Sequence, residues 1–370
     1  MKKILNKVTF ISVMQNLIYT VSYAQSQTNA DFSQIDNFVK NKSNENANIF
    51  SDIINNGMDF NFKNYFVNFF MLFKSSFAEN IKMMYTIGVI AVLAYFYESI
   101  MIDKKENKND AVKIFLCSLL AACCLYTVNI CLEKTYTCLC DVFDFMKISL
   151  PVYIGAVSVT GNLMSALYES LLMVFNNILY SVLIKFVIPV VFAISVLNIL
   201  STVFNLNFGK YTYKTAFGGI KSLITVMLAI FAGILSLTSM SAANAAFPGI
   251  NAVKFALGKF VPVAGGYLSD TVTAIAAAAS AIKGSVGIAG IAALLIIVSS
   301  PVIQIGASVA ALKIASIVLS PLFSEQSSDI LKTACDAAEI YFVIILCVTA
   351  AFTVSVAIVM SGISLLGNFI

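Results

Sequence analysis

The chain has 370 residues, of which 59% are hydrophobic and 11% are charged, and its formal net charge is +4. A soluble domain carries about a quarter charged residues, so this composition excludes a soluble globular protein and predicts an all-α, polytopic membrane protein. The charge is spread too thinly to indicate nucleic-acid binding.

The first 24 residues have the pattern of a secretory signal, with Lys2, Lys3 and Lys7 before a short apolar run and small residues at 22 and 24. Cleavage and retention as an anchor are both compatible with this pattern, and either places residues 25–82 outside the cytoplasm. We expect a weakly structured polar stretch over 25–57. Phenylalanines at helical spacing then predict an amphipathic helix over 62–77, which would lie on the membrane surface or dock a partner.

Residues 83–370 are predicted to form a transmembrane helix bundle of about seven spans. The lysines of segment 103–113, together with Lys210, Lys214 and Lys221, indicate the cytoplasmic side. Acidic residues predict two external loops, one after residue 132 and one over 324–339, and the C-terminus is then cytoplasmic. The spans are expected at residues 83–102, 111–132, 171–204, 222–243, 271–300, 302–319 and 340–366.

Two segments are expected to be irregular. Residues 151–167 are only moderately apolar, which favours a partial or re-entrant segment. The run 171–204 is interrupted by Asn176, Asn177, Lys185 and Pro189, which predicts a kinked or broken helix. Lys185 is either a snorkelling side chain or a residue that lines a pore.

Small residues recur at helical spacing in the second half of the chain, and such residues let helices approach closely. The packing could occur within one chain or between subunits of a ring. Four cysteines seven residues apart, at 117, 124, 131 and 138, indicate a helix contact in the same way. A thiol ladder for a metal or disulfide is the alternative. The small residues at helical spacing in the second half of the chain are Gly284, Gly287, Gly290, Ala307, Ala311 and Ala315.

An enzyme is not indicated. The chain has no His and no Arg, so it lacks the usual general base and the bidentate phosphate clamp. No Gly-rich loop ends in Gly-Lys-Ser/Thr, so any nucleotide-driven step needs another protein. We therefore expect no catalytic residue, no cofactor and no metal.

The most distinctive stretch is 252–270, AVKFALGKFVPVAGGYLSD. It resembles the pattern K-F-x-x-G-x-F-(I/V)-P-x-x-G-G-x-L-S-(D/E) of the stage III sporulation protein AE family of endospore-forming bacteria. The segment 282–290, IKGSVGIAG, is similar to the family's K-x-x-x-G-x-x-G. Asp270 could cap the helix that follows it, or hold a half-helix at a Gly-Gly break.

The resemblance implies a non-enzymatic membrane component of a channel complex between mother cell and forespore. It implies partners among the other stage III A operon proteins, including a cytosolic ATPase, and stage II sporulation protein Q. The lipid bilayer surrounds the chain, and self-association into a homo-oligomer is a further alternative. The alternatives are an independent secondary transporter and a structural scaffold. Lys185 and Lys283 are candidate lining charges, and the candidate hinge or pore element comprises Lys254, Lys259, Pro262, Gly265, Gly266 and Asp270.

Overall fold

The computed structural model describes residues 33–43, 62–102, 110–158, 163–206, 208–240, 285–319 and 325–364, and in these ranges the chain is helical apart from one turn. The helices are α2 (Ser33–Ser43), α4 (Phe62–Ile102), α5 (Asp110–Ser158), α6 (Leu163–Val182), the π-helix η1 (Leu183–Val187), α7 (Ile188–Val203), α8 (Phe208–Met240), α11 (Ser285–Leu319) and α12 (Glu325–Ser364). Within the described residues, six helical segments are long and apolar enough to cross a membrane. The predicted polytopic helix bundle is confirmed.

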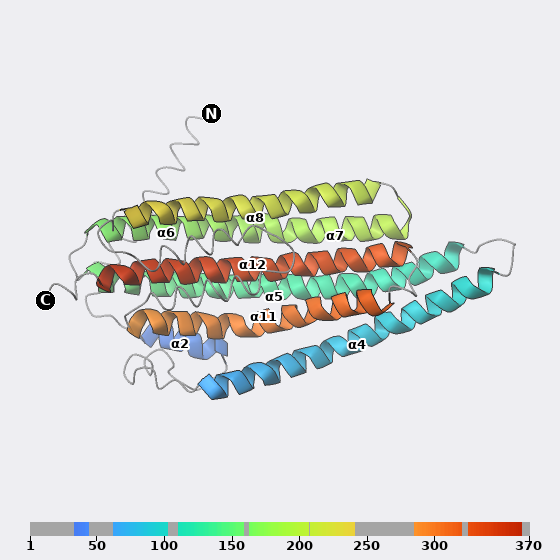
Figure 1. Cartoon of the computed structure of the whole chain (residues 1–370), viewed down its shortest axis with the longest axis horizontal. Coiled ribbons are helices and arrows are strands. Elements are labelled where there is room, and N and C mark those ends of the chain that lie inside the picture. The colour runs from blue at the N-terminus through green and yellow to red at the C-terminus, as the bar shows by residue number, and fades with distance from the viewer. Residues whose placement is uncertain are drawn as a thin grey trace, which may run out of the picture.

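The long helices run side by side and alternate in direction (Figure 1). Helices α5 and α12 lie in the middle, with α6, α7 and α8 on one side and α11, α4 and α2 on the other. The ends of α4, α7 and α11 therefore lie at the same end of the bundle as the starts of α5, α8 and α12. We call this the basic end, because the lysine-rich segment 103–109 joins α4 to α5 there.

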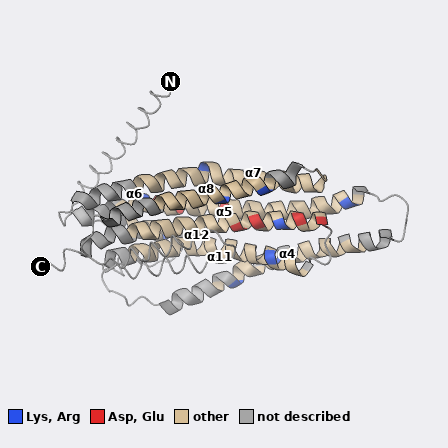
Figure 2. Ribbon diagram, turned by 45° about the horizontal axis from the view of Figure 1, so that its top comes forward, with Lys and Arg blue, Asp and Glu red and all other residues tan. Residues whose placement is uncertain are grey.

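The position of the acidic stretch 324–339 corrects the predicted topology. The sequence placed it in a loop on the side opposite the lysines, whereas it forms the first turns of α12 at the basic end (Figure 2). Asp and Glu contribute little to the rule that orients membrane proteins, and acids are favourable in the first turn of a helix. The predicted cytoplasmic C-terminus followed from the same error, because α12 ends at the end opposite to segment 103–109.

Two predicted helix boundaries are replaced by continuous helix. The expected spans 271–300 and 302–319 were separated at Pro301, but α11 passes through this proline. A proline removes one backbone hydrogen bond, and neighbouring side chains can satisfy the released groups inside a membrane. The expected amphipathic helix 62–77 and the first span are one helix, α4, which continues across the expected domain boundary at residue 82.

Helix α5 is likewise longer than predicted. The sequence indicated an external loop after residue 132 and a partial segment from 151, but α5 continues to Ser158. Two of its acids, Glu133 and Asp144, occupy exposed positions, and Asn129 Nδ2 donates to Glu133 Oε1 at 2.9 Å. The opposite face of the same stretch, including Cys138 and Phe145, is buried.

Helix α2 is a further correction. Residues 25–57 were predicted to be weakly structured, yet Ser33–Ser43 forms a helix that packs on α5 and α11. Ile35, Phe38 and Val39 have the i, i+3, i+4 spacing of one helix face, and Ile35 and Val39 are buried. The Phe38 ring lies 6.2 Å from that of Phe145.

The predicted break in 171–204 is confirmed as a π-helical turn. Between α6 and α7, the N–H of Ile188 bonds to the carbonyl of Leu183, five residues earlier. Pro189 follows directly and has no N–H to give to the preceding turn, and a π turn is a common way to absorb such a defect. Helix α7 ends at Val203, and Asn205 in the turn just beyond it has a φ of 54°, in the left-handed region that Asn tolerates.

Candidate functional site

A polar pocket lies between α4, α5 and α11, within the apolar span of each helix. Its volume is about 380 Å³, which is in the range of small-molecule sites. Most of its described lining residues have polar side chains, although the surrounding spans are apolar. The lining residues are Ser76, Asn80, Lys82 and Thr86 from α4, Cys123, Tyr126, Thr127, Ile130 and Lys134 from α5, and Gln304 and Ser308 from α11.

The centre of the pocket is a contact between α5 and α11. The ammonium group of Lys134 donates to Oε1 of Gln304, and Gln304 Nε2 donates to Ser300 Oγ at 3.1 Å. Lys134 and Gln304 lie near the middle of the apolar spans Val112–Leu150 and Ala289–Val318. The amide is neutral, so the lysine charge is hydrogen-bonded there but not neutralised.

The other wall is a contact between α4 and α11. The hydroxyl of Ser308 lies 3.2 Å from Asn80 Oδ1 and 3.0 Å from the carbonyl of Gln304, and it can donate to either. Asn80 Nδ2 donates to the carbonyl of Ser76 at 2.8 Å. Because Asn80 and Ser308 form side-chain hydrogen bonds with protein atoms, the two lysines are the strongest donors left to a ligand.

The pocket is electropositive. Lys82 and Lys134 contribute two positive charges, and the described lining residues include no carboxylate. Glu133 is next to Lys134 in the chain, but it is exposed and accepts its hydrogen bond from Asn129. Ionisable groups inside a membrane are costly and usually mark a functional site.

A second polar cluster, at the basic end, has a different character. Lys313 forms an ion pair with Glu339, and the Tyr213 hydroxyl donates to Asp336 Oδ2 at 2.6 Å. Asn198 Nδ2 donates to Thr333 Oγ1 at 2.7 Å. These bonds fix α11, α8 and α7 to the first turns of α12. The charged residues of this cluster contact oppositely charged or hydrogen-bonding partners. This cluster is suited to assembly of the bundle.

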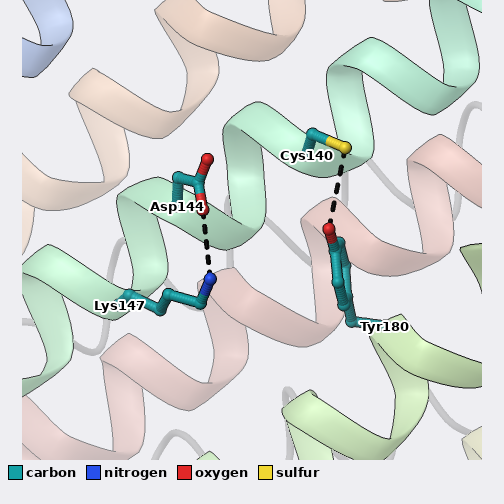
Figure 3. A network of polar contacts seen from close by, with 4 residues as sticks. All are labelled: Cys140, Asp144, Lys147 and Tyr180. Atoms are coloured by element: carbon teal, nitrogen blue, oxygen red, sulfur yellow. Dashed lines mark hydrogen bonds and ion pairs between the residues drawn. The ribbon is translucent and has the colours of Figure 1, made fainter.

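A third set of polar contacts joins α5 to α6 (Figure 3). The Tyr180 hydroxyl donates to Cys140 Sγ at 3.6 Å, and Lys147 forms an ion pair with Asp144 at 3.2 Å. The Tyr180 ring stacks on Phe143, with centroids 3.7 Å apart and an interplanar angle of 7°. Lys147 Nζ also lies 4.4 Å from the Phe143 centroid, so this set holds two neighbouring helices together.

The predicted site residues are only partly within the described structure. The hinge or pore element, Lys254, Lys259, Pro262, Gly265, Gly266 and Asp270, lies outside the described residues, as do Lys283 and Gly284. Lys185 is exposed in η1 and is not among the pocket residues. Gly287 lies in α11, while Gly290 and Ala307, Ala311 and Ala315 are buried within the bundle of this chain.

The seven-residue cysteine series lies along the buried face of α5. Cys117, Cys124, Cys131 and Cys138 have exposed fractions of 3% or less, and the eight cysteines of the chain are thiols that form no disulfide. Their burial supports the interpretation as helix packing. Cys123 and Cys140 are the two half-exposed thiols, and Cys123 lines the pocket.

The pocket residues were not among those predicted from the sequence. Their signal is present as polar pairs four apart in apolar runs: Ser76 with Asn80, Lys82 with Thr86, and Gln304 with Ser308. Residues at this spacing share a helix face. Which of these faces meet can be read only from the three-dimensional packing.

Comparison with known proteins identifies relatives of the chain. A family model described as stage III sporulation protein AE matches residues 45–362. The chain belongs to this family. A stage III sporulation protein AE of Bacillus subtilis (strain 168) is 27% identical over 184 residues, 48% of this chain and 45% of the relative. The alignment thus spans just under half of that relative. No solved structure matches.

The resemblance inferred from the sequence is therefore confirmed. The family match includes all residues of the pocket, from Ser76 to Ser308. Together with the six candidate spans, it establishes a multi-pass membrane protein of a sporulation family.

Proposed function

We propose that this stage III sporulation protein AE family member is a non-enzymatic membrane component of a channel or export complex between mother cell and forespore. The observation that carries the proposal is the family match over residues 45–362, which covers every described candidate span. The polar pocket between α4, α5 and α11 supports a role in passing or sensing a solute. A bundle that only anchored other proteins would need no such pocket.

The location and partners are part of the same proposal. The chain sits in the mother-cell membrane around the forespore, with the N-terminal region before the α4 span, which begins at Lys74, outside the cytoplasm and the basic end in the cytoplasm. A cytosolic ATPase of the stage III A operon would then act at the basic end, since the chain has no P-loop of its own. Stage II sporulation protein Q and the other stage III A proteins would meet the opposite side.

Deleting the gene in its endospore-forming host tests this function. Engulfment should complete, after which the forespore should shrink and a late forespore reporter should stay silent. An ectopic wild-type copy should restore both. Normal spores from the deletion strain would refute the proposal.

The independent-transporter alternative is favoured by one observation, the pocket itself. It predicts that the deletion strain takes up some solute poorly during growth, before sporulation begins. A strain that grows normally on defined media, and fails only after engulfment, excludes it. A strain with a growth defect and normal spores would favour it over the complex.

A further inference from the structure

We propose that the pocket between α4, α5 and α11 binds a small organic or inorganic anion carrying carboxylate or phosphate groups. The inference rests on the proposed function, because it specifies the class of solute that this membrane component would pass or sense. It is carried by two lysines in a pocket whose described lining contains no acid.

The chemistry of Lys134 points to an anion. Its described hydrogen-bond partner is the neutral oxygen of Gln304, and a lysine ammonium has three donors. Within an apolar span, a cation without a counter-charge is unfavourable. By contrast, Lys313 in the same bundle has Glu339 as its counter-ion. A carboxylate or phosphate between Lys134 and Lys82 would supply the charge that the protein does not.

The depth of the pocket favours a solute over a lipid headgroup. Lys134 and Gln304 lie near the middle of their spans, whereas headgroups occupy the membrane surface. The volume of about 380 Å³ is sufficient for a small molecule such as a dicarboxylate. Lys82 and Tyr126 are exposed at the pocket, so the pocket opens at the outer surface of the bundle.

The structure provides a direct reporter of occupancy. Cys123 lines the pocket, and among the eight cysteines only Cys123 and Cys140 are half-exposed. In a Cys140→Ala background, a small methanethiosulfonate reagent should therefore modify the folded protein mainly at Cys123. A bound solute blocks that reaction. At a concentration ten times its Kd, the rate should fall about tenfold by mass action.

The experiment uses the full chain in phosphatidylcholine nanodiscs, with succinate and inorganic phosphate as probes and putrescine as a cationic control. We expect at least one anion to slow modification of Cys123 and putrescine to have no effect. Lys134→Met should abolish the protection, whereas Lys147→Met on the exposed face of the same helix should retain it. Lys82→Met should weaken it, and serves as the second variant if Lys134→Met does not fold.

Several results would overturn the proposal: no protection by either anion, equal protection by putrescine, or protection that persists in Lys134→Met. Protection that appears only in nanodiscs containing phosphatidylglycerol would identify a lipid headgroup and refute the solute. Because anion binding is measured on purified protein, a negative binding result can occur while the deletion strain still shows the sporulation defect. The two proposals are thus refuted by different observations.

Discussion

Helices α12 and α4 show how differently two spans of one bundle are used. The share of buried residues in the apolar span is 78% in α12 and 25% in α4. Helix α12 packs against α5, α7 and α11, while α4 packs mainly against α11. On α12, Asp336 and Glu339 contact Tyr213 and Lys313, whereas α4 presents Asn80 and Lys82 to the pocket. The comparison separates a scaffold helix from a helix that forms a site.

The largest effect is expected for a buried aromatic residue of α12. The Tyr341 side chain is fully buried, and its hydroxyl donates to the carbonyl of Ile188 at 3.2 Å, next to the π turn. Tyr341→Ala should lower the free energy of unfolding by about 3–5 kcal/mol, because it leaves a cavity and removes that bond. The measurement is denaturant unfolding in mixed micelles.

The matched control is Tyr85→Ala on α4, where the side chain is 74% exposed. Its effect should stay within about 0.5 kcal/mol. Equal losses for the two variants would contradict the distinction between scaffold and site helix.

A smaller effect is expected at the basic end. Tyr213→Phe removes the hydroxyl that donates to Asp336 at 2.6 Å, and a hydrogen bond to a charged group contributes about 1.5–3 kcal/mol. The variant should unfold more easily by that amount in the same assay. Tyr136→Phe, on an exposed part of α5, should behave as wild type. No loss for Tyr213→Phe would mean that this cluster does not hold α8 to α12.

The sequence predicted the helical class and the irregular turn near Lys185 because these depend on local properties. Long apolar runs define spans, and a proline beside polar residues marks a defect. The small residues Ala307, Ala311 and Ala315, which the spacing singled out for helix packing, are buried in this chain.

The sequence did not predict the pocket, the continuity of α11 or the side on which α12 begins. Each depends on partners far away in the chain: Lys134 meets Gln304, 170 residues later, and Ser308 meets Asn80, 228 residues earlier. Counting acids and lysines along the chain placed 324–339 on the wrong side, because Glu339 is paired with Lys313 and Asp336 with Tyr213. Local charge has little predictive value where tertiary contacts pair or hydrogen-bond the charged groups.

The smallest effects are expected at two helical glycines and test how tightly each helix is packed. A Cβ at Gly306 of α11 would lie 3.3 Å from Cε2 of Phe342 on α12, whereas nothing lies within 4 Å of one at Gly88 of α4. Alanine in a helix is favoured over glycine by about 0.5–1 kcal/mol. Gly88→Ala should therefore stabilise the protein by that amount. For Gly306→Ala we expect a change near zero, because Phe342 must shift to make room.

If Gly306→Ala stabilised the protein as much as Gly88→Ala, the contact between α11 and α12 would be looser than the structure shows, and α12 would lose its distinction from α4.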